Sequence, residues 1–280
     1  MNKFGGDWTK IKIEILVNYA KAFLSIMKGR KYYKLLYFDG FAGSGFISKD
    51  KKKDVEITVG AARRIIEISD PRPFDIYYFV EKDPKNFKLL KQNTKEAFPE
   101  KIIHVIREDC NKKIIDLANY LLDPENKNVR TLAYIDPCGM QVEWRSIESL
   151  KGLPLDMWIL VPTGLGVNRL LTRNGNISDI WIERLEKFLG LSGKEIEKRF
   201  YSKKLEQTLF GEESMKTKER GAIKKSAEIY QERLKEIFKF VSEPYELKNS
   251  QNSIMYHLFL TSNNKAAVKI GNDIVKKYNN

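Results

Sequence analysis

Four acidic residues stand at or beside the ends of short apolar segments in this chain of 280 residues. They are Asp39 in "LLYFDG", Glu81 in "YYFVEKD", Asp109 in "HVIREDC" and Asp136 in "LAYIDPCG". Ligands of open α/β sheets bind at the carboxyl ends of the strands, where carboxylates accept hydrogen bonds from hydroxyl and amino groups. We interpret Glu81 as an acceptor for two ribose hydroxyls and Asp109 as an acceptor for an adenine amino group. The pattern predicts an adenosyl ligand.

A glycine-rich loop, "DGFAGSGFISKD", follows the first of these segments. No Gly-Lys-Ser/Thr follows, which excludes a P-loop, and the third glycine of a dinucleotide fingerprint is replaced by Ser48. Gly43 and Gly45 would let the backbone approach a ligand. Backbone amide groups at the N-terminus of the next helix would then bind a carboxylate of this ligand. The alternative interpretation is a tight turn between strand and helix.

Short apolar segments alternate with helical ones along most of the chain. The expected strands are "KLLYFD", "DIYYFVEKD", "IIHVIRED", "RTLAYIDP" and "DMWILVPTG", separated by segments such as "ITVGAARRIIEIS", "PKNFKLLKQNTKEAF" and "NKKIIDLANYLL". This alternation predicts a parallel sheet covered by helices on both faces. Two late segments, "EPYELKN" and "IMYHLFLTSN", predict an antiparallel hairpin at the edge, which makes seven strands. A final helix, "KAAVKIGNDIVKKY", follows.

We expect a single domain over residues 1–280, with two additions to the sheet core. Apolar residues recur every fourth position in "DWTKIKIEILVNYAKAF", which predicts an amphipathic helix within an N-terminal extension, residues 1–32. Residues 172–242 include a long, highly charged stretch that we interpret as a helical insertion or lid.

Charge and cysteine content narrow the class of protein. The net charge of +13 suits an anionic partner such as DNA or RNA, although much of this charge alternates with glutamate and is equally typical of solvated helices. Two cysteines cannot form a disulfide framework, and no CxxC pair suggests a metal site. No apolar run reaches the ~18 residues of a transmembrane helix. We therefore expect a cytoplasmic protein without membrane association or bound metal.

The motifs together resemble class I S-adenosylmethionine-dependent methyltransferases. "DGFAGSG" is similar to the "FAGSG" loop of amino-methyltransferases that act on nucleic acid bases. "LLYFDGFAGSG", "FVEKD", "YIDPCGMQVEW" and "ILVPTGLGVNRL", with the N-terminal helix, more closely resemble the three-Cys-motif partner family. This resemblance covers most of the chain to about Leu171. It implies a Rossmann-like fold, S-adenosylmethionine as cofactor, and a neighbouring three-cysteine iron-sulfur radical protein as partner.

The resemblance also implies roles for individual residues. The loop would surround the methionine part of the cofactor, Glu81 would hold the ribose, and Asp109 with Cys110 the adenine. Lys82, next to Glu81, would also belong to the cofactor site. Asp136, fixed by Pro137, would face the substrate amine. The loop residues concerned are Asp39, Gly40, Ala42, Gly43, Ser44 and Gly45.

The motif after the fourth strand departs from that of amino-methyltransferases. Cys138 and Gly139 stand where the second proline and the aromatic residue would be, so base stacking from this position is lost. "IDPCG" is closer to the acidic-Pro-Phe-Gly motif of tRNA guanine dimethyltransferases. Trp144 could supply an aromatic face beside Gly139, although packing of a helix onto the sheet is the favoured interpretation.

Other residues have two interpretations each. Asn168 and Arg169 would contact an anionic group of the substrate, or lie in a plain strand-to-helix connection. His104 and His257 lie in apolar segments and are interpreted as core or edge residues. The two cysteines follow strands about 14 Å apart, which is too far for a disulfide.

Three functions compete at this point. The first is a methyltransferase acting on a nucleic acid base or a nucleotide-like amine. The second is a methyltransferase-like accessory partner of a radical enzyme, which the change at Cys138 and Gly139 favours. An NAD-dependent oxidoreductase comes third, because the fingerprint is incomplete.

Overall fold

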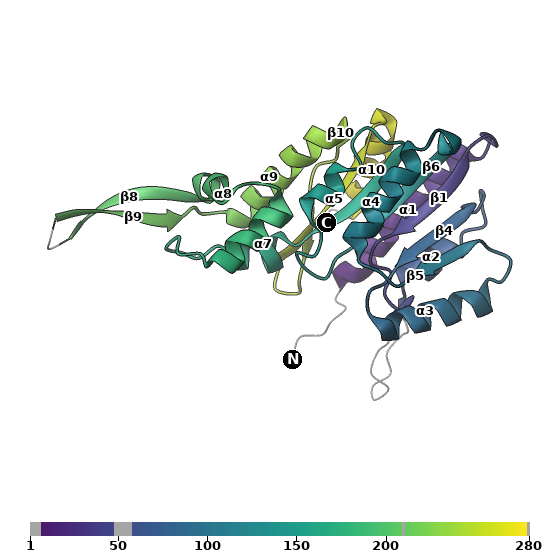
Figure 1. The fold of residues 1–280 in the computed structure, drawn as a ribbon, viewed down its shortest axis with the longest axis horizontal. Coiled ribbons are helices and arrows are strands. Elements are labelled where there is room, and N and C mark those ends of the chain that lie inside the picture. The colour runs from purple at the N-terminus through teal and green to yellow at the C-terminus, as the bar shows by residue number, and fades with distance from the viewer. Residues whose placement is uncertain (1–6, 48–57, 209–210, 279–280) are drawn as a thin grey trace.

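The computed structural model describes residues 7–47, 58–208 and 211–278, and one eight-stranded mixed sheet forms its centre (Figure 1). In spatial order the strands are β10 (Phe240–Val241), β12 (Ile254–Ser262), β7 (Leu155–Val161), β6 (Val129–Ile135), β1 (Lys34–Asp39), β4 (Ile76–Val80) and β5 (Ile103–Ile106), with β11 (Tyr245–Lys248) also paired to β12. The strands from β7 to β5 are parallel, and β12 runs antiparallel to all its neighbours. The predicted Rossmann-like methyltransferase fold, with its antiparallel C-terminal hairpin, is confirmed. The short strand β10 adds one strand to the seven expected.

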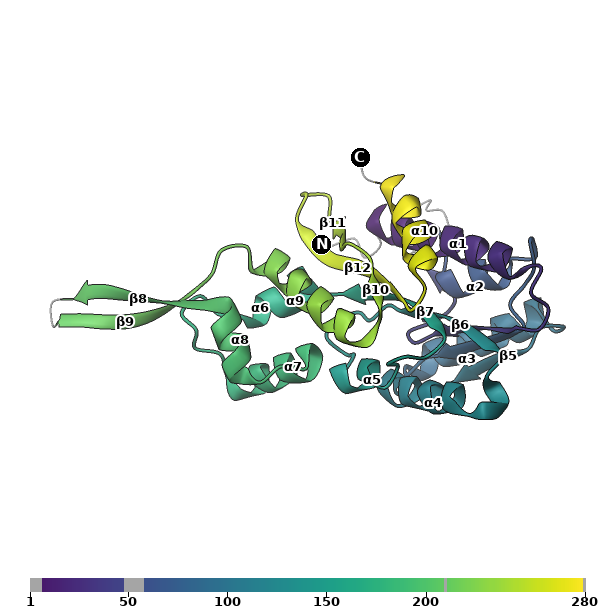
Figure 2. The same ribbon diagram turned by 90° about the horizontal axis from the view of Figure 1, so that it is seen from above.

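Helices cover both faces of the sheet (Figure 2). One core joins the sheet to α1 (Asp7–Met27), α2 (Ala61–Ile66), α3 (Pro84–Ala97) and α10 (Lys265–Lys276). The other joins it to α4 (Cys110–Leu122), α5 (Trp144–Glu148), α7 (Asp179–Leu189), α8 (Gly193–Phe200) and α9 (Ala222–Ile237). In the described part of the chain, we find no helix with both the length and the apolar character needed to cross a membrane.

The N-terminal helix α1 is fixed firmly against the sheet. Ile15 and Tyr19, two members of its predicted apolar stripe, are buried. The Tyr19 ring packs edge-on against Trp158 of β7 with the ring centroids 5.5 Å apart, an arrangement favourable for aromatic pairs. Residues 1–6 of the predicted extension, and Ser48 of the glycine loop, lie outside the described residues. The position of α1 matters for the site, because its first turns lie over the edge of the sheet that carries Asp136.

The insertion between β7 and β10 is only partly helical, which corrects the expectation for residues 172–242. Besides α7, α8 and α9 it contains β8 (Tyr201–Thr208) and β9 (Gly211–Lys218), which pair along their length as an antiparallel hairpin. Figures 1 and 2 show this hairpin projecting away from the body of the protein. Lysine and glutamate are good helix formers, so the composition of the segment favoured helix. The strands are instead stabilised by cross-strand pairing, which composition does not reveal. A lid function for this segment stays a prediction.

The remaining elements are short. They are β2 (Phe46–Ile47), β3 (Thr58–Val59), a 3-10 turn (Pro124–Asn126), a π-helical turn (Thr163–Val167) and α6 (Asn168–Leu170). The pairing of β2 with β3 closes the described end of the glycine loop against the start of α2.

Candidate active site

The carboxyl ends of β1, β4 and β6 bring three of the predicted carboxylates to one edge of the sheet. Asp39 is in register with Phe79 on β4 and with Tyr134 on β6. Glu81 and Asp136 follow these register partners by two residues each. The charges of both raise the pKa of the Asp39 carboxyl, so all three share one electrostatic environment.

Asp39 is the most buried of these carboxylates, with a relative exposure of 1%. Its Oδ1 accepts a hydrogen bond from the Phe41 backbone N–H at 3.0 Å, and its Oδ2 lies 3.5 Å from the Tyr37 hydroxyl. Burial raises the pKa of Asp39 to about 7, although the Phe41 hydrogen bond opposes the shift. A positive group bound beside this carboxyl would therefore stabilise its ionised form.

The glycine loop folds back over the ends of β4 and β6. The Gly40 N–H donates to the Tyr134 carbonyl, and the Ala42 N–H donates to the Val80 carbonyl. A Cβ atom at Gly40 would lie 2.5 Å from the Cys110 sulfur, so any larger residue would force the Cys110 side chain to shift. Gly43 adopts a φ of +63°, the left-handed region that favours glycine.

The space beside Gly43 is empty of described atoms. A Cβ atom built on this residue would have no heavy atom within 4 Å. Ser44 and Gly45 continue the loop, and Leu90 of α3 packs close to Gly45. The loop is therefore open at Gly43 and closely packed at Gly40 and Gly45. Contact of these residues with a cofactor stays a prediction.

The carboxylate of Glu81 is half-exposed and partly engaged. Its Oε1 accepts a hydrogen bond from the Asp83 backbone N–H at 2.7 Å. Asp83 in turn caps the N-terminus of α3 by accepting from the Lys85 and Asn86 N–H groups. This arrangement fixes the Glu81 side chain at the end of β4, and its Oε2 has no hydrogen-bond partner among the described residues.

Asp109 and Lys82 form a pair that links the ends of β4 and β5. The Lys82 Nζ atom lies 2.9 Å from Asp109 Oδ2, and Asp109 Oδ1 accepts from the Asn111 N–H as the N-cap of α4. Burial raises the pKa of the Asp109 carboxyl, but these hydrogen bonds outweigh it and lower the pKa overall. Cys110 is buried against Gly40, so its thiol packs against the glycine loop and is not exposed to a ligand.

Asp136 makes the most notable contact of the site, with a residue that the sequence did not single out. Its Oδ2 lies 2.5 Å from the Nζ atom of Lys12 on α1 and 3.0 Å from the Tyr134 hydroxyl. The side chains of Lys12 and Asp136 are only 10% and 17% exposed. Pro137 is buried directly after Asp136, which fixes the start of the following loop.

A signal for Lys12 was present in the sequence. Trp8, Lys12, Leu16 and Ala20 are spaced by four residues and share one face of α1. Leu16 and Ala20 are buried, so the lysine interrupts an apolar face. A cation at such a position needs a buried partner, and Asp136 is that partner.

Two aromatic side chains lie beside the Lys12–Asp136 pair. The Lys12 ammonium lies 5.0 Å from the centroid of the Trp8 ring, and this ring lies 5.2 Å from that of Tyr256 on β12. Burial raises the pKa of Tyr256 to about 12; the charge of Asp136 adds to this shift and that of Arg169 opposes it. Arg169 thus acts electrostatically on Tyr256, and its role in substrate binding stays a prediction.

The other predicted substrate residues are not all available. Trp144 is buried, and its ring packs edge-on against Tyr230 and under the Arg233 guanidinium, so it fulfils the packing interpretation and presents no free face. The Asn168 side chain accepts a hydrogen bond from Lys218 at 2.7 Å, which ties it to the hairpin. Gly139 has open space beside it.

The interpretations of the histidines and cysteines are confirmed. His257 is buried in β12, where its Nδ1 lies 2.7 Å from the Thr163 hydroxyl and burial lowers its pKa to about 4. His104 is exposed on the edge strand β5. Cys110 and Cys138 are both free thiols, the first buried and the second exposed.

Comparison with known proteins gives similarity of structure only. No family model matches the chain, and no curated protein matches it. LPL1258 from Legionella pneumophila, assigned to the family model DUF519, is similar at 14% identity and a TM-score of 0.49, over 98% of this chain and 93% of that one. Trm1 from Pyrococcus horikoshii, solved with S-adenosyl-L-methionine, has 12% identity and a TM-score of 0.49, over 94% of this chain and 57% of that one. An rRNA methylase from Streptococcus thermophilus has 10% identity and a TM-score of 0.33, over 82% of this chain and 87% of that one.

The chain thus spans little more than half of the length of the Trm1 chain. At these values the similarities carry no argument about function, and the fold assignment rests on the strand order and pairing of the chain itself. That order is the one of a Rossmann-like, class I methyltransferase fold.

Proposed function

We propose that this protein is an S-adenosylmethionine-dependent methyltransferase. The observation that carries the proposal is the meeting of Asp39, Glu81 and Asp136 at one sheet edge, beside a glycine loop that is open at Gly43. Asp39 and the loop would hold the methionine part of the cofactor, Glu81 the ribose, and Lys82 with the Asp109–Cys110 helix start the adenine. S-adenosylmethionine, when bound there, would supply an electrophilic methyl group on a positively charged sulfur.

The substrate in this proposal is an amine on a nucleic acid base or a nucleotide-like molecule. Asp136 would accept a hydrogen bond from the amine and orient its lone pair toward the methyl group, and positioning of this kind supplies much of the rate in such reactions. Since Lys12 and Tyr134 both occupy Oδ2 of Asp136, the amine would use Oδ1 or displace Lys12. The net charge of +13 and exposed Arg169 support an anionic substrate.

The rings of Trp8 and Tyr256 support the choice of a planar base. The loop after β6 lacks the aromatic residue of amino-methyltransferases, since Gly139 occupies that position. Trp8 and Tyr256 lie next to the Lys12–Asp136 pair and come from α1 and β12. Tyr256 is buried, so the half-buried Trp8 ring would supply the aromatic surface that the loop does not, with Tyr256 packed behind it. Stacking on a base is worth roughly 1–3 kcal/mol.

Thermal unfolding tests the cofactor assignment directly. A ligand that binds only the folded state raises its stability, by about 2.7 kcal/mol at one hundred times its dissociation constant. We expect S-adenosylmethionine and its demethylated product to raise the melting temperature, and NAD to leave it unchanged. Stabilisation by NAD alone would overturn the proposal in favour of an oxidoreductase.

Replacement of Glu81 tests the ribose contact. If both ribose hydroxyls donate to this carboxylate, Glu81→Ala should weaken cofactor binding by about 1.5–3 kcal/mol, as expected for hydrogen bonds to a charged group. The matched control is Glu108→Ala, since Glu108 pairs with Lys112 after the neighbouring strand. Calorimetric titration measures both variants. A loss of binding free energy well below 1 kcal/mol for Glu81→Ala would indicate that the ribose binds elsewhere.

The raised pKa of Asp39 predicts a pH dependence. The ammonium group of the cofactor's methionine part would bind the ionised carboxylate, and with a folded pKa of about 7 that form increases between pH 6 and 7.5. We expect the cofactor affinity of the wild type to rise severalfold over this interval, and we expect Asp39→Asn to lack this pH dependence. A wild-type affinity that parallels that of Asp39→Asn at every pH would exclude this contact.

The same pKa fixes the sign of the stability change. The folded state holds the Asp39 proton more tightly than the unfolded chain, whose pKa is near 3.8. The free energy of unfolding should therefore fall as the pH rises from about 4 to about 7, and Asp39→Asn should flatten this decline.

A second candidate function is an accessory partner of a three-cysteine radical protein, without catalysis. The observations that favour it are the motif change at Cys138 and Gly139 and the engagement of Asp136 by Lys12. The accessory partner would bind either S-adenosylmethionine or no ligand. If the protein binds the cofactor, methyl transfer separates the two candidates.

A further inference from the structure

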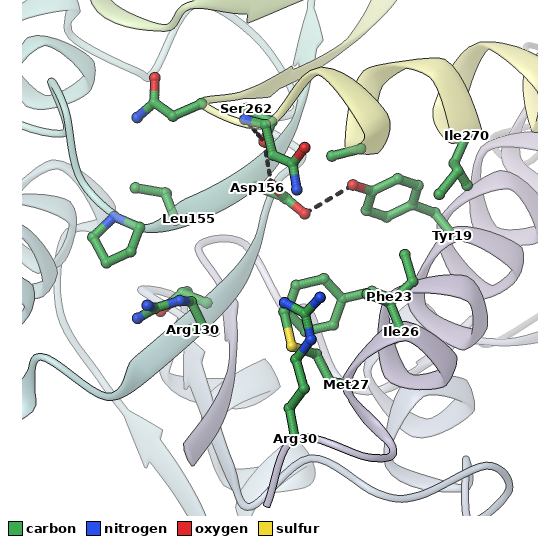
Figure 3. Close-up of a pocket in the computed structure, with 15 residues that line it drawn as sticks. Tyr19, Phe23, Ile26, Met27, Arg30, Arg130, Leu155, Asp156, Ser262 and Ile270 are labelled. Carbon is green, nitrogen blue, oxygen red and sulfur yellow. Dashed lines mark hydrogen bonds between the residues drawn. The ribbon is translucent and has the colours of Figure 1, made fainter. Parts of the chain in front are cut away.

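A cavity of about 250 Å³ lies between α1, α10 and the beginnings of β6 and β7 (Figure 3). Arg130, which lines it, is the second residue of β6, whereas Asp136 follows the end of the same strand. A strand of seven residues spans about 20 Å, so the cavity and the candidate active site lie at opposite edges of the sheet. The proposed methyltransferase function uses no residue of this cavity.

One side of the cavity carries the carboxylate of Asp156. The Tyr19 hydroxyl donates to its Oδ2 at 2.8 Å, and the Ser262 hydroxyl donates to its Oδ1. A carboxylate oxygen has two lone-pair positions, so each oxygen can accept one more hydrogen bond. Asp156 keeps partial exposure while burial raises its pKa. A cationic donor in the cavity would offset the cost of ionising it there.

The opposite side of the cavity carries the guanidinium of Arg30. Figure 3 shows this side chain extending from the loop that follows α1 toward Asp156 and Tyr19. Among residues 7–47, 58–208 and 211–278, no acidic side chain pairs with Arg30. Arg130, also at the cavity, already donates to the carbonyls of Lys127 and Val129. Arg30 is thus the guanidinium available for an anionic group.

Much of the lining between these two charges is apolar, although Thr131, Asn263 and Asn264 also line the cavity. Phe23 and Met27 of α1 and Ala267 and Ile270 of α10 contribute apolar side chains to this lining. At about 30 Å³ per water molecule, the volume equals about eight waters, which is the size of a molecule of about ten non-hydrogen atoms. A ligand that matches the lining has a positive group, a negative group and a small apolar body.

We propose that this cavity binds a small zwitterion of the α-amino acid type with an apolar side chain. Its ammonium group contacts Asp156, and its carboxylate contacts the Arg30 guanidinium. Its side chain lies against Phe23 and Ile270. This assignment satisfies both charges, whereas a simple amine leaves Arg30 unpaired and a simple carboxylate leaves Asp156 unpaired.

Calorimetric titration with L-leucine tests the assignment. We expect saturable binding below about 10 mM, with at least tenfold weaker binding of N-acetyl-L-leucine, which lacks the ammonium group, and of 3-methylbutylamine, which lacks the carboxylate. Failure of L-leucine and L-phenylalanine to bind would overturn the proposal and leave Asp156 as a purely structural link between Tyr19 and Ser262. Equal binding of leucine and either analogue would also overturn it.

Variants locate the site. Arg30 is exposed, so Arg30→Gln should fold normally and weaken leucine binding at least tenfold. Ala267→Met should fill the cavity and block binding without touching either charged group. The control is Lys21→Gln, which removes a charge from the exposed side of α1 and should leave the affinity unchanged. An equal loss in the Arg30 and Lys21 variants would place any binding outside the cavity.

Discussion

Asp136→Asn should reduce methyl transfer by a factor of roughly 10² or more, the scale seen when one transition-state-stabilising group is removed. The amide keeps the size of the side chain but loses the charge that would orient the substrate amine. Cofactor affinity should hardly change, because Asp136 lies on the substrate side of the expected methyl group. The measurements are transfer of a labelled methyl group to RNA, DNA and nucleotides, and calorimetric titration with S-adenosylmethionine.

The contact with Lys12 makes a second control necessary. Lys12 is nearly buried, and removal of its partner leaves an uncompensated charge, which typically costs 3–5 kcal/mol of stability. Combining Asp136→Asn with Lys12→Met removes both charges. We expect the double variant to recover the melting temperature lost in Asp136→Asn but to stay inactive. Recovery of activity together with stability would mean that Asp136 acts only through folding.

The wild-type protein decides between enzyme and accessory partner. If it binds S-adenosylmethionine but transfers no label to nucleic acid, nucleotides or the proteins of a cell extract, the methyltransferase proposal fails. The accessory function would then replace it. A normal transfer rate in Asp136→Asn would instead keep the enzyme and remove the residue from its mechanism.

Gly43→Val should abolish cofactor binding while the protein still folds. No described atom lies within 4 Å of the position a Cβ would take, so the new side chain meets only the space expected for the ligand. A β-branched residue at a φ of +63° adds backbone strain of roughly 1–2 kcal/mol. That strain alone should lower stability without unfolding the chain.

Gly152→Val separates backbone strain from loss of the site. Gly152 also has a positive φ, +76°, and no atom within 4 Å of a built Cβ, but it lies in the turn before β7 at the other edge of the sheet. Both variants should lose similar stability in thermal unfolding, and only Gly43→Val should lose calorimetric binding of S-adenosylmethionine. Equal affinity in the two variants would show that the cofactor does not approach Gly43.

The sequence by itself predicted the sheet core and the carboxylates at its edge. The parallel strands are rich in apolar residues. Asp39 is the last residue of β1, and Glu81 and Asp136 directly follow the last residues of β4 and β6. Parallel strands end at the same edge of a sheet, so local order along the chain is enough to bring Asp39, Glu81 and Asp136 together. The same reasoning placed the glycine loop, because it begins at Gly40, next to Asp39.

Only the tertiary structure decided which further side chains lie at the candidate active site and which predicted ones lie elsewhere. Lys12 reaches Asp136 across 124 residues of sequence, and Tyr256 arrives from the last strand of the sheet. Trp144 packs against Tyr230 in the core. The strand β8 pairs with β9, although the composition of this segment favours helix. The physical reason is common to all of them: packing and pairing between distant segments set these contacts, and no periodicity within one segment encodes its partner.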